Sequence, residues 1–141
     1  MNLEFFQASK DHIPVIFRQA KELIETYEDL TTIDLEKVLT WMEHKIALNI
    51  SAYTAVTAMG KTCAFYHLCE GGELDDLYVL SEFQNRGIGS AIMEKCIAES
   101  ENPIYLYVFS RNHRAISFYK RFGFSIREKV GQTRLIMARK G

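Results

Sequence analysis

The sequence predicts an α/β domain with about six to seven strands and about four helices. Three patterns predict this class: apolar residues three and four apart in the first third, alternating segments in the middle, and an almost wholly apolar run at 104–109. The chain has 141 residues, of which 48% are hydrophobic and 25% are charged. These values are typical of one globular domain, which we expect to span residues 1–141.

The N-terminal half is expected to form one strand, two helices and a hairpin. A short strand is predicted over 2–8, and an amphipathic helix with apolar residues three and four apart ends near Tyr27. A second helix follows Asp34, whose side chain can cap it. Alternating segments at 51–59 and 62–69 then predict two antiparallel strands.

A third strand is predicted over 73–80, and its alternation is defective. Asp75 and Asp76 adjoin, and four apolar residues follow them without interruption. An extra residue in one strand breaks the period of two in this way. We therefore predict a β-bulge near Leu77–Val79.

The rest of the chain is predicted as a helix, a strand, a second helix and a hairpin. The first helix ends before an Asn-Pro pair, which disfavours helical backbone. The strand at 104–109 is apolar at almost every position, as expected when both faces are covered. The predicted order is a helix to about Ser100, a strand at 104–109, a helix at 112–123, and strands at 124–130 and 133–139.

The stretch 84–90 joins the third strand to the following helix and predicts an anion site. The first N–H groups of a helix lack intrahelical partners, and the helix dipole adds positive charge there. Gly87 and Gly89 leave these groups open to a ligand such as phosphate, although two glycines also suit a simple tight turn. A P-loop is excluded because Ser90 and Ala91 follow Gly89, and Ile92 is too large for a dinucleotide fingerprint.

Two motifs carry a resemblance to a known family. The pattern Gln84-x-x-Gly87-x-Gly89 is followed by a second pattern, Asn-x-x-Ala-x-x-Phe-Tyr-x-x-x-Gly-Phe, over 112–124. Together they resemble the GNAT superfamily of acyl-CoA N-acyltransferases, from about Glu73 to the end of the chain. The resemblance implies the GNAT fold, a mixed central sheet flanked by helices. It also implies transfer of an acetyl group from acetyl-CoA to a primary amine by direct attack in a ternary complex. The alternative is a non-catalytic acyl-CoA-binding or regulatory module of the same fold.

The resemblance also implies which residues bind acetyl-CoA. The N–H groups at the start of the helix would hold the pyrophosphate, and backbone groups of the preceding strand would hold the pantetheine and the acetyl carbonyl. Two residues of the later helix would complete the site. The expected cofactor-binding residues are Leu77, Tyr78, Val79, Gln84, Asn85, Arg86, Gly87, Ile88, Gly89, Ser90, Asn112 and Tyr119.

Two further residues are candidates for proton transfer. A lysine-like amine has a pKa of about 10.4, so a base must take its proton, and an acid helps the thiolate to leave. Tyr119 lies where the family often has such an acid, although a core tyrosine is the alternative. Glu73 lies where some members have a catalytic base, with Asp75 and Asp76 as competitors and an exposed glutamate as the plain alternative.

Other reactive residue types give no site. The three cysteines show no C-x-x-C spacing, and the histidines show no ligand spacing, so we expect no metal. Cys69 and His67 alternate on one strand, but the sequence places no residue to orient the histidine, as nucleophilic catalysis requires. Trp41 is expected to pack in the core.

Charge is unevenly distributed along the chain. Residues 22–36 contain six acids and no lysine or arginine, while residues 110–141 contain nine basic residues and one acid. The basic third suits a ligand with several phosphates, although a solvated surface is the alternative. The acidic segment would form one wall of the acceptor cleft in this family, which favours a cationic amine such as a polyamine or a lysine-type side chain. A solvated acidic helix face is the alternative.

Composition also limits the partners and the compartment. The net charge of −1 argues against a protein that coats nucleic acid, and no apolar run is long enough to span a membrane. The first residues lack the pattern of a signal peptide, and the cysteines suit a reducing compartment. We therefore expect a cytoplasmic protein, either monomeric or homodimeric.

Overall fold

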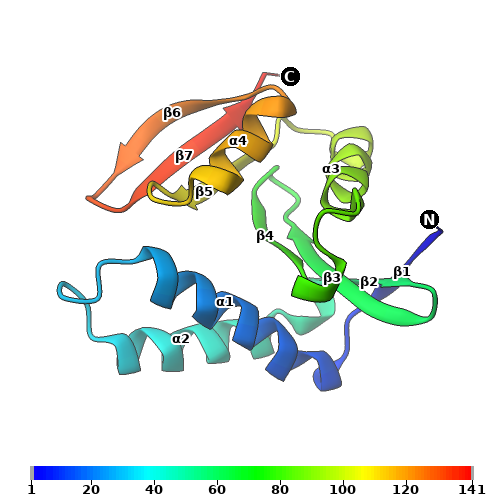
Figure 1. Cartoon of the computed structure of the whole chain (residues 1–141), viewed down its shortest axis with the longest axis horizontal. Helices are drawn as coiled ribbons and strands as arrows, with labels where there is room; N and C mark the ends of the chain where they lie inside the picture. The colour runs from blue at the N-terminus through cyan, green and yellow to red at the C-terminus, as the bar shows by residue number, and fades with distance from the viewer. Residues whose placement is uncertain (1, 141) are drawn as a thin grey trace.

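The computed structural model describes residues 2–140, and its α/β architecture confirms the expected fold class (Figure 1). Within these residues the chain forms seven strands and four α-helices, with short 3-10 turns between some of them. The strands are β1 (Leu3–Gln7), β2 (Thr54–Ala58), β3 (Lys61–Leu68), β4 (Leu74–Val79), β5 (Tyr105–Phe109), β6 (Phe124–Val130) and β7 (Arg134–Arg139). The helices are α1 (Ile13–Tyr27), α2 (Leu35–Leu48), α3 (Ile88–Glu99) and α4 (His113–Arg121).

The strands form two sheets that touch at one point. The N-terminal sheet has the antiparallel order β1-β2-β3-β4, and the C-terminal sheet has the antiparallel order β5-β7-β6. A single parallel bridge between Glu73 and Tyr105 links them at the start of β4 and β5. Beyond this bridge no ladder joins β4 to β5 in the described chain, so the central sheet opens into a gap between them.

The joint between the sheets is tight because the backbone at Gly72 approaches the loop before β5. Gly72 accepts a hydrogen bond from the N–H of Tyr105 at 3.1 Å. A Cβ at Gly72 would lie 2.4 Å from the carbonyl oxygen of Pro103, and φ is +101°. Only glycine can adopt this positive φ and lie this close to the Pro103 carbonyl oxygen without strain. The closed end of the gap therefore depends on this residue.

Strand β4 contains the expected bulge, but at a different position. The ladder with β3 pairs His67 with Asp76 and Leu68 with Leu74, so Asp75 is the extra residue. The prediction of a bulge near Leu77–Val79 was wrong by two residues. The register of a bulge depends on the partner strand, which the sequence of β4 alone does not reveal.

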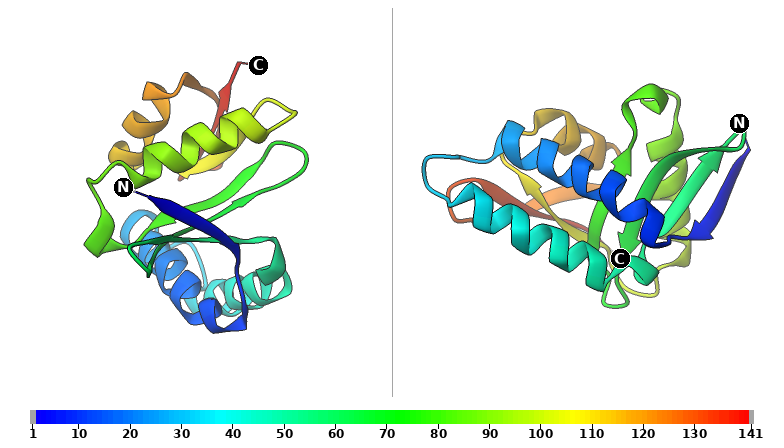
Figure 2. Two further views of the ribbon diagram at one scale, coloured as in Figure 1. Left: turned by 90° about the vertical axis from the view of Figure 1, so that its right-hand side faces the viewer. Right: turned by 90° about the horizontal axis from the view of Figure 1, so that it is seen from below.

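Two apolar clusters lie on opposite faces of the N-terminal sheet. Helices α1 and α2 pack together on one face, and helix α3 covers the other (Figure 2). In α1 the buried residues Ile16, Ala20 and Ile24 recur four apart, as the amphipathic pattern predicts. The predicted cap of α2 is confirmed, because the Asp34 carboxylate accepts the N–H of Lys37 at 3.2 Å.

Candidate active site

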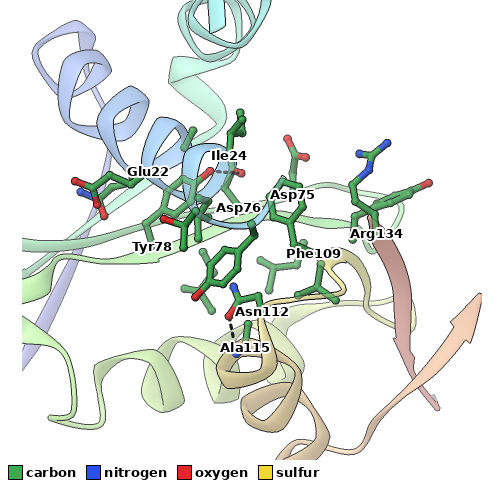
Figure 3. Close-up of a pocket in the computed structure, with 18 of the residues that line it drawn as sticks. Glu22, Ile24, Asp75, Asp76, Tyr78, Phe109, Asn112, Ala115 and Arg134 are labelled. Carbon is green, nitrogen blue, oxygen red and sulfur yellow. Dashed lines mark hydrogen bonds between the residues drawn. The ribbon is translucent and has the colours of Figure 1, made fainter. Parts of the chain in front are cut away.

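Two cavities meet in the gap between β4 and β5, where they share lining residues. One cavity, of about 490 Å³, lies on the side of α3 and α4. The other, of about 540 Å³, lies on the side of α1 and α2 (Figure 3). The residues that line both are Leu23, Tyr27, Leu77, Val79, Gln84, Asn112, Ala115 and Tyr119. Two ligands that enter from opposite sides can therefore meet in the gap.

The edge of β4 presents backbone groups to this gap. The N–H of Leu80 donates to the carbonyl of Cys63 on β3 at 2.9 Å. Because successive residues of a strand point their backbone groups to opposite sides, the groups of Val79 and Leu77 point toward the gap. The carbonyl of Val79 accepts the side-chain amide of Gln84 at 3.1 Å, which agrees with this direction. The backbone of Tyr78 faces β3 instead, where Tyr78 pairs with Phe65.

The loop before α3 brings a helix N-terminus to the first cavity. Gly87 caps α3 in the left-handed conformation, with φ of +81°, and Gly89 lies in the first turn beside the rings of Phe118. Except for Arg86, the predicted loop residues line this cavity: Gln84, Asn85, Gly87, Ile88, Gly89 and Ser90. The exposed Arg86 guanidinium lies over the ring of Phe83.

Arg114 of helix α4 holds this loop in place, and the sequence did not single it out. Its guanidinium donates to the side-chain oxygens of Gln84 at 3.3 Å and of Asn85 at 2.9 Å. Arg114 and Arg121 also line the first cavity and give it positive charge. The signal for Arg114 was its place inside the second motif, but only the fold shows that it reaches the loop.

The side chain of Asn112 caps helix α4 with its oxygen and faces the cavity with its nitrogen. Its side-chain oxygen accepts the N–H of Ala115 at 3.1 Å and so caps helix α4. Its amide nitrogen points into the cavity (Figure 3). Asn112 lines both cavities, as the prediction of a ligand contact requires.

Tyr119 combines packing with access to the gap. Its ring makes an edge contact with Phe118 and a tilted contact with Phe124, at centroid distances of 5.4 and 5.7 Å. The side chain still lines both cavities. Burial raises the pKa of its hydroxyl above the usual value, and the negative charge of Asp76 adds to this. Tyr119 therefore keeps its proton at neutral pH and can donate it.

The bulge in β4 determines which side chains face the second cavity. Leu74 packs in the cluster on the α3 face, together with Leu77, whereas Tyr78 packs in the cluster on the α1 face. With strict alternation Leu74 and Tyr78 would share a face. The extra residue removes this conflict and directs both Asp75 and Asp76 to the second cavity (Figure 3).

The two adjacent aspartates have different partners. Asp75 lies 3.0 Å from the ammonium of Lys45 and 3.5 Å from Nδ1 of His67, and these contacts hold the pKa of its carboxyl below the usual value. Asp76 accepts hydrogen bonds from the hydroxyls of Tyr53 and Tyr78. Burial and the charge of Asp75 nevertheless raise the pKa of Asp76.

Glu73 lies beside the bridge to β5 and lines the second cavity. Burial raises the pKa of its carboxyl, and the negative charge of Asp75 raises it further. A carboxylate with a raised pKa is a better proton acceptor than an exposed glutamate. Glu73 and Asp76 therefore both line the second cavity, and both have a raised pKa.

Cys69 and His67 lie together, and the structure supplies the orienting residue that the sequence did not show. The sulfur of Cys69 is 3.6 Å from Nε2 of His67, and Asp75 lies on the other side of the ring. However, burial and the charges of Asp75 and Glu73 raise the pKa of the Cys69 thiol. A protonated thiol is a poor nucleophile, and Cys69 lines neither cavity of the gap.

The acidic segment between α1 and α2 contributes less to the cavity than expected. Of its six acids only Glu22 lines the second cavity, and Asp29 instead binds the backbone and hydroxyl of Thr31. Trp41 lines the cavity and is 59% exposed, so the expectation of a core position was wrong. The charged residues that line the cavity are Glu22, Lys45, Glu73, Asp75, Asp76 and Arg134.

Two other kinds of feature are absent from the described chain. Between residues 2 and 140 no cluster of three or more His, Cys, Asp or Glu side chains is arranged to hold a metal ion. None of the helices in this range combines the length and apolar character needed to cross a bilayer.

The model of the Acetyltransferase (GNAT) family matches residues 19–124. The chain therefore belongs to the GNAT acetyltransferase family, as the two sequence motifs predicted.

Relatives with curated names match part of the chain. An uncharacterised N-acetyltransferase of Methanocaldococcus jannaschii is 37% identical over 65 residues, which are 43% of this chain and 29% of the relative. A peptidyl-lysine N-acetyltransferase of Escherichia coli is 34% identical over 67 residues, which are 48% of this chain and 45% of the relative. The matches thus span less than half of either relative.

Solved structures match the whole fold. A PaiA N-acetyltransferase from Thermoplasma acidophilum, solved in complex with coenzyme A, has a TM-score of 0.73. The two proteins are 20% identical, and the match covers 100% of both chains. At this identity the likeness establishes the fold.

Proposed function

We propose that this protein transfers an acetyl group from acetyl-CoA to a primary amine while both substrates lie in the gap between β4 and β5. The observation that carries the proposal is the meeting of two cavities in that gap. Acetyl-CoA would enter from the side of α3 and α4, and the amine from the side of α1 and α2. Tyr119 and the edge of β4 lie where the two cavities meet.

The first cavity has the chemistry that a phosphate-bearing ligand such as acetyl-CoA requires. Its volume of about 490 Å³ is in the usual range for ligand sites. The N–H groups from Gly87 to Ser90 would bind the pyrophosphate at the start of α3, and Arg114 keeps their loop in place. The complex of the Thermoplasma protein with coenzyme A supports this assignment for a protein of the same fold.

The edge of β4 would hold the reactive end of acetyl-CoA. N–H groups that point into a gap can bind the pantetheine amides and the thioester oxygen. The N–H groups of Leu77 and Val79 point that way, because those of the alternate residues are used by β3. A donor aimed at the developing oxyanion lowers the barrier by roughly 3–4 kcal/mol in enzymes where it was measured.

The reaction would proceed by direct attack. The acceptor ammonium first loses a proton to Glu73, either directly or through water, and the amine nitrogen attacks the thioester carbonyl carbon. The new C–N bond forms, the C–S bond breaks, and the departing thiolate takes the proton of the Tyr119 hydroxyl. The raised pKa of Glu73 suits its role as the base. Tyr119 is protonated at neutral pH and so has a proton to give. The second proton of the nitrogen leaves to solvent.

A covalent route through Cys69 is disfavoured. A double-displacement mechanism requires a reactive thiolate in contact with both substrates. The pKa of Cys69 is raised, and its side chain lines neither cavity. Direct attack needs no such residue.

The acceptor is proposed to be positively charged. The second cavity is lined by four acids, Glu22, Glu73, Asp75 and Asp76, and by two basic residues, Lys45 and Arg134. An excess of negative charge attracts a cationic substrate. The similarity to a peptidyl-lysine N-acetyltransferase points in the same direction, since lysine presents an ammonium.

The proposal is tested by measuring CoA release from acetyl-CoA with a thiol reagent. The amine panel contains a lysine amide, spermidine and a short peptide with a free N-terminus, and mass spectrometry identifies the N-acetyl product. Release that depends on an amine, in step with product, is the expected result. Tight binding of acetyl-CoA without release for any amine would instead identify an acyl-CoA-binding module.

A further inference from the structure

The bulge in β4 creates an imbalance of charge beside the reacting centre. It directs two consecutive carboxylates, Asp75 and Asp76, into the second cavity. Asp75 is neutralised by Lys45 at 3.0 Å and lies 3.5 Å from His67. Between residues 2 and 140 no lysine, arginine or histidine forms an ion pair with Asp76. Asp76 is therefore the member of this pair without a cationic partner. Burial and the charge of Asp75 raise its pKa, and a cation beside it would favour its ionised form.

The Asp76 carboxylate is held in a fixed position. Tyr78 donates its hydroxyl to one carboxylate oxygen at 2.7 Å, and Tyr53 donates to the other. The ring of Tyr53 is almost fully buried against α1 and α2, so this donor cannot move away. Two neutral donors orient a carboxylate but do not cancel its charge, and an unpaired charge away from water is costly. A cationic ligand would offset that cost.

The location of Asp76 identifies which part of a ligand would meet it. Asp76 and Tyr119 both line the second cavity, and Tyr119 also lines the first, so Asp76 lies on the cavity that opens toward the meeting point. Glu73 lies just before β4, at the bridge that closes the gap. A cation at Asp76 would therefore be next to the acetyl group and would be the nitrogen that is acetylated.

We propose that Asp76, held by Tyr53 and Tyr78, binds the acceptor ammonium and orients its nitrogen toward the thioester before Glu73 takes the proton. This role rests on the proposed acetyltransferase function. It makes Asp76 a specificity-determining residue, which selects amines that are charged when they bind. The neighbouring Asp75 has a different role, because its charge is already matched by Lys45.

The test compares two acceptors in wild type and in Asp76→Asn. n-Pentylamine is an ammonium at neutral pH, whereas aniline is neutral. Loss of a hydrogen bond to a charged group changes affinity by about 10-fold or more, so KM for n-pentylamine should rise by at least that factor. KM for aniline and KM for acetyl-CoA should hardly change. Glu94→Gln removes an exposed acid of α3 that lines neither cavity, and it controls for the loss of one charge.

The outcomes separate this inference from the proposed function. An inactive wild type would contradict the function itself. An active wild type together with an Asp76→Asn variant that keeps its KM for n-pentylamine, or loses activity equally on both amines, would overturn the role of Asp76. If Asp76→Asn does not fold, Tyr78→Phe is the second variant. It removes one of the two hydroxyls that hold the Asp76 carboxylate and leaves that carboxylate in place. A rise in KM for n-pentylamine without a change for aniline is then expected, and unchanged values would overturn the proposal.

Discussion

Tyr119 combines the packing of a core tyrosine with a place on the gap. Its ring packs against Phe118 and Phe124, as a core tyrosine would, yet it lines both cavities of the gap. The second motif singled out this residue in the sequence, but a packing role and a chemical role could not be separated there. Only the position of the gap relative to α4 shows that the packed ring also lines the gap, as the proposed acid must.

Tyr119→Phe removes the hydroxyl and keeps the ring. If the hydroxyl protonates the departing thiolate, kcat should fall by about 10²-fold or more, because general acids contribute that much. The affinity for acetyl-CoA, measured by calorimetric titration, should remain as in wild type. Unchanged kcat under conditions where chemistry limits the rate would reduce Tyr119 to a packing residue.

The proposed role of Glu73 as the base predicts how the rate depends on pH. A base must be deprotonated to act, so kcat/KM should fall as the pH falls through the pKa of Glu73. Burial and Asp75 raise this pKa above 4.5, so the acidic limb should lie above that value. Glu73→Gln should lower kcat and remove this limb from the profile. A variant that keeps both the limb and the rate would assign the base to another group.

Strand β4 is the element that the sequence predicted least completely. Its irregular alternation revealed that a bulge exists, because Asp75 and Asp76 break the period of two. The position of the bulge follows from the pairing of His67 and Leu68 with β4, which no local pattern encodes. The partners of the aspartates come from α2 and from the residue before β2, so their different environments are also long-range properties.

The joint between the sheets makes a prediction about stability. In Gly72→Ala the new Cβ would lie 2.4 Å from the Pro103 carbonyl oxygen, at a φ of +101°. Strain and overpacking each cost about 1–3 kcal/mol, so the free energy of unfolding in urea should drop by roughly 2–6 kcal/mol.

The adjacent glycine is the matched control for this change. A Cβ at Gly71 would have no heavy atom within 4 Å beyond its chain neighbours, and the φ of Gly71 is not positive. Gly71→Ala should therefore change stability by no more than about 0.5 kcal/mol. Equal stability of the two variants would mean that the sheets are not held together at Gly72.

The loop before α3 makes a prediction about binding. Gly89→Asp adds a carboxylate in the first turn of α3, where it would repel the pyrophosphate. The fold should tolerate the change, since a Cβ at Gly89 would make ordinary contacts of 3.5 Å or more. Calorimetry should show that the folded variant no longer binds acetyl-CoA. Wild-type affinity in a folded Gly89→Asp variant would refute the phosphate assignment.

At the scale of the whole molecule, the sequence predicted the elements and their order but not the space between them. The periodicities marked the strands and helices, and the two motifs predicted the family to which the chain belongs. The gap arises because β4 and β5 share one bridge and then pair with different neighbours. The acidic segment shows the same limit, since only Glu22 of its six acids lines the cavity that the fold creates.

Direct transfer requires that this one gap hold both substrates at the same time. This requirement is tested by calorimetric titration with a bisubstrate analogue, in which the sulfur of CoA is joined through an acetyl linker to the best amine of the panel. If the two cavities meet as described, the analogue should bind at least about 10²-fold more tightly than CoA, because linking two ligands makes the second contact intramolecular. An affinity no higher than that of CoA would contradict a shared gap and, with it, direct transfer.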